Sequence, residues 1–249
     1  MAIYDNYSAR ARVGAGVKLK QGVAARIFAM GLAPSAATVC KVLELGPGDG
    51  YISELSRNQG VAYTAVEGSA EIAAALRRRG VQVLEGYVPP LPATLNGQFS
   101  ACFMLHVLEH MSGPQAAATL LDEIRAKLLP GGTLTIVCPA FEHWGARFYD
   151  CDYTHSFPLT RRRLEQLLRD QGFELVVNTV HCGPGFGRRW IALSWFARLL
   201  WPGWLDALVG HRIPGDWLNR GLLSFMPNLV MVARKPQAVN LPAADQDPA

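Results

Sequence analysis

VLELGPGDG, residues 42–50, joins a short apolar run to a glycine-rich loop, and an amphipathic stretch follows at 51–58. The apolar run predicts a buried strand, and the glycines permit the tight turn and close ligand approach of a strand-to-helix loop. In α/β sheets, ligands bind beyond the carboxyl ends of the strands, beside the N-terminus of the next helix. This stretch therefore predicts a ligand site at the edge of such a sheet.

The charges around this loop distinguish between two classes of nucleotide ligand. A dinucleotide loop has the spacing GxGxxG and must neutralise a pyrophosphate, whereas here the spacing is GxGxG and Glu44 and Asp49 are acidic. Two carboxylates would repel a pyrophosphate and favour a ligand that carries an ammonium and a sulfonium. Glu67 ends the next apolar run, where a carboxylate accepts both hydroxyls of a ribose. Gly86 and Tyr87 end the third run, where a small residue and a ring can flank an adenine.

Apolar runs and amphipathic stretches alternate along most of the chain. We predict strands at 42–45, 62–67, 81–86, 100–105, 133–139, 173–180 and 227–235, and helices at 51–58, 69–80, 115–129 and 160–172. Strand and helix at this spacing indicate a parallel sheet wound on both faces. We expect one domain over 1–237, divided into an N-terminal lid at 1–40, a cofactor-binding core at 42–180, a Trp-rich helical insertion at 186–224 and a final strand at 226–235, with a flexible tail at 238–249.

The ordered set of motifs resembles the class I S-adenosylmethionine-dependent methyltransferases. ELGPGDG (44–50) resembles their first motif, VEGS (66–69) their ribose acid and LPGGTLTIVCP (129–139) their fifth-strand motif, and HVLEHM (106–111) is similar to the branch with quinone and sugar methyltransferases. The resemblance implies a seven-stranded, mostly parallel Rossmann-like sheet with an antiparallel last strand, and S-adenosyl-L-methionine as cofactor. It places the methionine moiety on the glycine loop, and Leu105 and His106 near the sulfonium. The predicted cofactor residues are Glu44, Gly46, Pro47, Gly48, Asp49, Gly50, Glu67, Gly68, Gly86, Tyr87, Leu105 and His106.

The loop FYDCDYTHSFPLT (148–160) carries the predicted base for an acceptor hydroxyl. Methyl transfer is an in-line displacement that depends on positioning, and an oxygen acceptor must also lose a proton. Histidine suits that role near neutral pH. We predict that His155 is the base and Asp152 orients it, with His110 as the second candidate. A turn that Asp152 stabilises and in which His155 only packs is the alternative.

A metal is a second interpretation of the same histidines. His106, Glu109 and His110 lie together in the sequence, and His155 or His143 could complete a ligand set. Methyltransferases that resemble this segment carry ExxEH and bind a divalent ion there, but His106 replaces the first glutamate in this chain. We therefore expect no metal, and keep the metal set as the alternative. A polar cluster at a helix start would need no ligand at all.

Composition limits the kinds of binding partner and the cellular compartment that we expect for this protein. The net charge of +4 is too small to indicate a nucleic-acid-binding protein. Five cysteines without a CxxC pair indicate reduced thiols, as in a cytoplasmic protein. The Trp-rich stretch 190–209 has three interpretations: a roof over an apolar pocket, a peripheral contact with the inner membrane face, or a homodimer contact.

We therefore predict transfer of a methyl group from S-adenosylmethionine to a hydroxyl of a small or lipid-linked molecule, sugars included. Transfer to nitrogen or carbon would need no essential base and remains an alternative. A catalytically silent binding subunit with the same fold is the alternative from another class.

Overall fold

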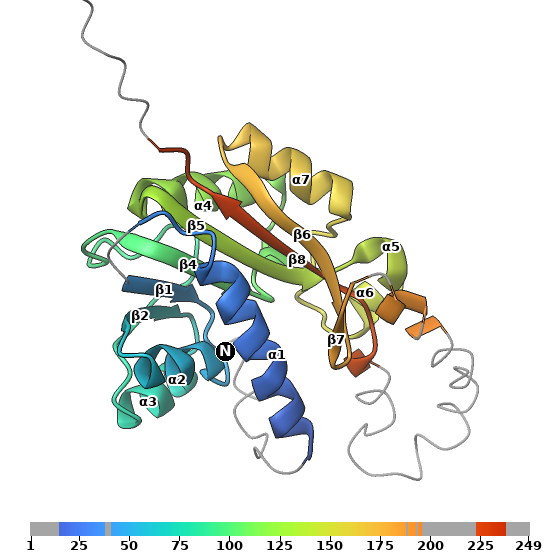
Figure 1. The fold of residues 1–249 in the computed structure, drawn as a ribbon, viewed down its shortest axis with the longest axis horizontal. Helices are drawn as coiled ribbons and strands as arrows, with labels where there is room; N and C mark the ends of the chain where they lie inside the picture. Colours follow the sequence, from blue (N-terminus) through green and yellow to red (C-terminus); the bar gives the residue numbers. More distant parts are fainter. Residues whose placement is uncertain (1–14, 38–40, 188, 193, 196–222, 238–249) are drawn as a thin grey trace, which may run out of the picture.

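The computed structural model describes residues 15–37, 41–187, 189–192, 194–195 and 223–237. A twisted central sheet runs through the molecule, with helices on both of its faces (Figure 1). The strands are β1 (Lys41–Leu45), β2 (Ala62–Glu67), β3 (Val83–Glu85), β4 (Phe99–Leu105), β5 (Leu128–Pro139), β6 (Glu174–Cys182), β7 (Gly185–Phe186) and β8 (Asn228–Arg234). The helices are α1 (Ala15–Leu32), α2 (Tyr51–Asn58), α3 (Ala70–Arg78), the 3-10 turn η1 (Leu108–His110), α4 (Pro114–Lys127), α5 (Phe141–Trp144), α6 (Arg147–Asp150) and α7 (Arg161–Asp170).

The strand order is β3-β2-β1-β4-β5-β8-β6-β7. The first five strands in this order are parallel to one another. β8 lies between β5 and β6 and is antiparallel to both. The Rossmann-like sheet with an antiparallel last strand is thus confirmed. The expected count of seven strands is wrong, since the described residues form a sheet of eight strands. The additional strand is the two-residue β7, which forms a hairpin with β6. Two residues are too few to show the alternation of apolar and polar residues by which a strand is predicted.

Side chains alternate between the two faces of β1, and helices bury both faces. Val42 packs in one core cluster with Phe28 of α1 and Ile52 of α2. Leu43 and Leu45 point to the opposite cluster, which α4 and α7 cover. Burial on both faces explains why these strands read as continuous apolar runs.

Several predicted helix boundaries are confirmed by capping contacts. Ser69 accepts a hydrogen bond from the backbone of Ile72, and Thr160 accepts one from Arg163. The helix predicted at 115–129 ends earlier, at Lys127, because Leu128 already pairs with Phe99 as the start of β5.

Much of the predicted lid, most of the Trp-rich insertion and the tail lie outside the described residues. Among the helices that are described, none combines the length and the apolar character that crossing a bilayer requires.

Two glycines of α1 provide a matched test of helix-to-sheet packing. A Cβ at Gly31 would lie 2.4 Å from Oγ1 of Thr135 and 2.6 Å from Cε1 of Phe103, so Gly31→Ala should push α1 off the sheet and cost about 1–3 kcal/mol of unfolding free energy. A Cβ at Gly22 would meet no described atom within 4 Å, so Gly22→Ala should stabilise the protein by about 0.5–1 kcal/mol. Urea denaturation measures both values, and equal effects of the two substitutions would contradict this packing.

Candidate functional site

The glycine loop between β1 and α2 has the backbone conformation that its sequence predicted. Gly46, Gly48 and Gly50 have φ angles of 65°, 47° and 73°, in the left-handed region that side chains rarely adopt. A Cβ at Gly46 would lie 2.7 Å from Cγ2 of Val107, so this glycine lets the end of β4 approach the loop. At Gly48 a Cβ would have no described atom within 4 Å. The loop is therefore packed at its base and open at Gly48, where a ligand can reach the backbone.

Glu67 turns back from the end of β2 onto this loop. Its carboxylate accepts a hydrogen bond from the backbone N–H of Ser69 at 2.9 Å, and the backbones of Gly48 and Gly68 also bond to it. Burial raises the pKa of Glu67, and these three hydrogen bonds oppose the rise. The carboxylate is thus fixed beside the open part of the loop, where it can accept further hydrogen bonds from a ligand.

Glu44 is fully buried beneath the same loop, and its carboxylate accepts a hydrogen bond from the hydroxyl of Tyr63 on β2. Burial raises the pKa of Glu44 to about 8, the hydrogen bond from Tyr63 opposes this, and the charge of Glu67 adds to the rise. A cation bound beside these two acids would favour their ionised forms and so lower both raised pKa values. Tyr63 was not predicted as a site residue, and only its place in the strand beside β1 could have indicated it.

The other predicted cofactor residues gather at the same edge of the sheet. The ring of Tyr87 covers Gly68, since a Cβ there would lie 2.8 Å from the ring. Gly86 packs close to Pro92, since a Cβ on this glycine would lie 3.1 Å from Cγ of Pro92. Asp49 instead forms an ion pair with Lys20 of α1 at 3.6 Å.

The end of β4 turns sharply at His106. Among the described residues, His106 is the non-glycine residue with a positive φ, 57°. Its backbone N–H bonds to Val137 on β5, and its Nδ1 lies 3.0 Å from Oε1 of Glu109. A left-handed conformation at a bulky residue is strained and occurs preferentially at functional sites.

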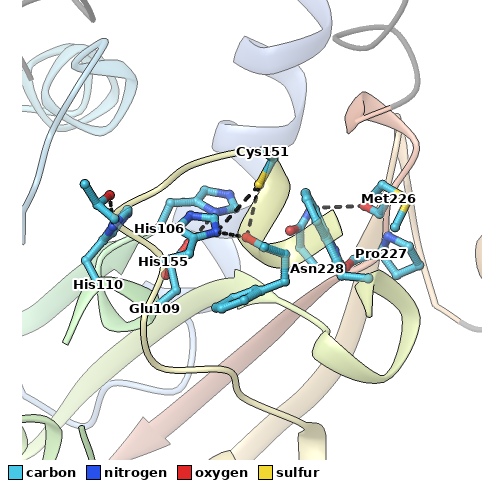
Figure 2. A network of polar contacts seen from close by, with 11 residues as sticks. His106, Glu109, His110, Cys151, His155, Met226, Pro227 and Asn228 are labelled. Carbon is cyan, nitrogen blue, oxygen red and sulfur yellow. Dashed lines mark hydrogen bonds and ion pairs between the residues drawn. The ribbon is translucent and has the colours of Figure 1, made fainter. Parts of the chain in front are cut away.

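Glu109, His110 and His155 form a compact cluster beside this turn (Figure 2). One candidate ligand atom from each lies within 4.8 Å of the other two. Glu109 is 1% exposed, and its Oε2 atom has no hydrogen-bond partner in the described part of the chain. A buried carboxylate oxygen without a donor is costly, so the cluster is incomplete without a further group.

The contacts of His155 fix which of its ring nitrogens carries a proton. Its Nδ1 lies 2.6 Å from the backbone carbonyl of Phe148, which can only accept. The proton is therefore on Nδ1, and the neutral ring has its lone pair on Nε2.

The contacts of His110 lead to the same tautomer. Thr154 donates its hydroxyl proton to Asp152 at 2.6 Å, so its oxygen accepts from Nδ1 of His110 at 2.8 Å. Burial is the largest influence on the pKa of His110 and lowers it, which favours the neutral ring near pH 7. His155 can therefore offer an Nε2 lone pair to a proton or to a metal ion, whereas His110 also bonds to the backbone of Thr154.

The expected pairing of Asp152 with His155 is not the one that the structure contains. Asp152 bonds the backbone and hydroxyl of Thr154 and so orients His110, while Phe148 orients His155. Burial alone would raise the pKa of Asp152, but the bonds from Thr154 and the two nearby histidines lower it overall. Asp152 and Thr154 lie together in DYTH (152–155), but the histidine that they orient, His110, lies in η1. His106 and His143, the other two predicted metal ligands, are not part of the cluster.

Comparison with known families and structures adds independent evidence. The family model described as "Methyltransferase domain" matches residues 18–178, more than half of the chain. No curated protein sequence matches the chain.

Three solved structures share the fold at low sequence identity. A methyltransferase crystallised with the Trm112 methyltransferase activator of Haloferax volcanii has a TM-score of 0.61 and 16% identity, over 89% of this chain and 93% of that one. The [4+2]-cyclase SpnF has a TM-score of 0.60 and 17% identity, over 92% and 86%. Magnesium protoporphyrin IX methyltransferase from Synechocystis PCC 6803, with bound S-adenosylhomocysteine, has a TM-score of 0.58 and 11% identity, over 92% and 91%.

The raised pKa of Glu44 predicts how the stability of the ligand-free protein depends on pH. The folded state favours the protonated carboxyl, so this contribution is complete below about pH 4.5 and is lost as the pH rises through about 8. The wild type should therefore lose about 3–5 kcal/mol relative to Glu44→Gln, which keeps an acceptor for Tyr63, over that range. Urea denaturation at a series of pH values measures the difference, and parallel pH profiles would refute it.

Proposed function

The chain belongs to the S-adenosylmethionine-dependent methyltransferases, and from this premise we propose that it methylates an oxygen atom of a small-molecule or lipid-linked acceptor, sugars included. The observation that carries the proposal is the pair of buried acids, Glu44 and Glu67, beside a glycine loop that is open at Gly48. A cationic nucleoside bound beside these acids would stabilise their ionised forms, whereas a phosphate chain would raise their pKa values further.

In the proposed complex, Glu67 accepts the hydroxyls of the ribose, and the loop backbone at Gly48 contacts the methionine moiety. Asp49 contributes by holding α1 through Lys20. Gly86 and Tyr87, at the end of β3, lie beside the adenine, and the ring of Tyr87 packs on Gly68. His106 and Leu105, at the end of β4, face the methyl group. Because the sulfonium already activates the methyl carbon, these residues act mainly by alignment, which can supply several kcal/mol.

The acceptor proton would go to Nε2 of His155 or His110. In His155 the carbonyl of Phe148 holds Nδ1, so Nε2 has the lone pair and a fixed direction. In His110 the ring is held by the hydroxyl and the backbone of Thr154. A base in this arrangement contributes roughly a hundred- to ten-thousand-fold to the rate. Transfer to nitrogen or carbon remains an alternative, and in that case loss of either ring would lower activity only modestly.

The unpartnered Oε2 atom of Glu109 favours a second candidate, metal-assisted methylation of a hydroxyl. Two imidazole nitrogens and one carboxylate oxygen are a ligand set for zinc and related ions, at about 2.0–2.2 Å from each atom. Since such ligands lie at most about 4 Å apart, the cluster, now within 4.8 Å, would need only a slight contraction. A bound ion would lower the pKa of the acceptor hydroxyl, and the histidines would then be ligands and not bases.

The reaction class is tested first by cofactor binding. Isothermal titration calorimetry should show that the wild type binds S-adenosylmethionine and not NAD. Glu67→Gln should weaken binding about 10–100-fold, because it removes the charge from an acceptor of hydroxyl hydrogen bonds. The matched control is Glu71→Gln, an exposed residue of α3, which should leave affinity unchanged.

Two results would reject the proposed reaction. A folded wild type that binds no S-adenosylmethionine would instead support the silent subunit. Because SpnF shares this fold and is named a cyclase, transfer of an isotope-labelled methyl group must also be measured. Cofactor binding without any methyl transfer to hydroxylated acceptors would exclude the proposed reaction.

A separate experiment distinguishes base from metal. If a metal is used, zinc added to chelator-treated protein should raise the melting temperature and bind near one equivalent by elemental analysis. Glu109→Gln and His155→Ala should abolish that binding, whereas His143→Ala should not. Full activity and no bound zinc after chelation would exclude the metal and leave the histidine base.

A further inference from the structure

Two buried polar atoms on neighbouring strands have no role in the site described above. His181 of β6 and Asn228 of β8 are directly paired in an antiparallel register, so their side chains lie next to each other on the same face. Within the described residues, Nδ1 of His181 and Oδ1 of Asn228 are buried without a hydrogen-bond partner. Asn228 is 7% exposed, and its Nδ2 donates to the carbonyl of Met226 at 3.2 Å, which fixes the direction of Oδ1. Buried polar groups are seldom left unpaired, so this pair calls for a ligand.

The pair lies on the face of the sheet that α1 covers. Val230, two residues after Asn228 on β8, packs in the same cluster as Phe28 of α1. The ring of His181 lies 5.3 Å from that of Phe186 on β7, and the guanidinium of Arg26 from α1 lies 4.8 Å from the same Phe186 ring. The β6–β7 hairpin and α1 therefore form two walls around the unpaired atoms.

The Trp-rich insertion begins against the same hairpin. The indole of Trp190 lies directly over Gly185, so that a Cβ on this glycine would be 1.8 Å from Cε2 of the ring. Only glycine allows this contact. Because Gly185 pairs with Cys182 and not with His181, the indole lies on the face of the hairpin opposite to the His181–Asn228 pair and forms no part of its surroundings.

This place lies at the same edge of the sheet as the turn at His106. Asn228 pairs with Pro139 at the end of β5, and the backbone N–H of His106 bonds to Val137 on the same strand. The charge of His106 also lowers the pKa of His181. Burial is the larger cause, and the pKa of His181 falls to about 4, so the ring is neutral at physiological pH. A group bound at His181 would thus lie on the acceptor side of the β4 turn. Figure 2 shows Asn228 in the same region as the histidine cluster.

The chemistry of the two atoms selects the group that would bind. Oδ1 of an amide only accepts, whereas Nδ1 of a neutral imidazole accepts or donates according to its tautomer. A carboxylate or phosphate would place negative charge against Oδ1, and an ammonium would lie close to His106 and Arg26. A hydroxyl donates one hydrogen bond and accepts others, and therefore satisfies both atoms.

We propose that His181 and Asn228 form a binding subsite for a neutral hydroxyl group of the methyl acceptor, which they hold while another oxygen of the same molecule faces the cofactor. This subsite rests on the proposed function for its role in catalysis, but its binding chemistry does not require turnover. The acceptor class that follows is a neutral molecule with at least two hydroxyls.

The test uses methyl α-D-glucopyranoside as a neutral polyhydroxyl probe on the full-length protein. With ¹⁵N-histidine labelling, the probe should produce a saturable change in the Nδ1 signal of His181, which is assigned by its absence in His181→Phe. Asn228→Leu should raise the dissociation constant obtained from that signal about tenfold, because it removes one of the two hydrogen-bond partners of the probe. An unchanged titration in Asn228→Leu, or no response of His181 in the wild type, would overturn the proposal.

Stability provides a second measurement that does not depend on the probe. His181→Phe keeps the contact with Phe186 and removes a buried unpaired nitrogen, so its melting temperature should rise by about 3 °C. Its affinity for S-adenosylhomocysteine should equal that of the wild type. A lower melting temperature would show that His181 is a structural residue and would contradict the proposal. If the wild type binds the glucoside but no S-adenosylhomocysteine, the proposed function fails and the subsite remains.

Discussion

Burial of negative charge at the carboxyl ends of β1 and β2 is the constraint on which the rest of the site depends. A carboxylate removed from water is destabilised, and the raised pKa values of Glu44 and Glu67 record that cost. Tyr63 offsets part of it for Glu44, and three backbone N–H groups offset part of it for Glu67. Protonation removes the remaining cost in the empty protein, and a bound cation would remove it by stabilising the ionised carboxylates instead.

The parallel sheet is what brings these groups together. The carboxyl ends of β1, β2 and β4 lie at one edge, and the glycine loop can approach Val107 because Gly46 has no side chain. The same edge continues through β5, β8 and β6, which carry the acceptor side of the site. The cofactor residues therefore lie on the early strands, while the histidine cluster and the pair His181–Asn228 lie on the later ones.

Three buried polar atoms without partners lie on the side of the site that we assign to the methyl acceptor, whereas the acids Glu44 and Glu67 lie on the side that we assign to the cofactor. Oε2 of Glu109, Nδ1 of His181 and Oδ1 of Asn228 are all buried without partners in the described residues. A protein that needed only stability would replace such groups with apolar ones. They lie at the same edge of the sheet as the strained turn at His106, and our proposals assign them to binding.

The sequence by itself determined the class of fold, the glycine loop, the acids at 44 and 67 and the antiparallel last strand, because these depend on local periodicity, glycine spacing and an ordered set of motifs. It also named His110, Asp152 and His155, which the structure brings together, and it expected Asp152 to bond His155, whereas the side chain of Asp152 bonds Thr154, which bonds His110. Only the tertiary structure decided that pairing, because Thr154 and His110 are 44 residues apart and meet through the folding of two loops. The tertiary structure alone also revealed Tyr63 beneath Glu44, and His181 opposite Asn228, since strand register and burial are properties of the assembled sheet and not of any one segment.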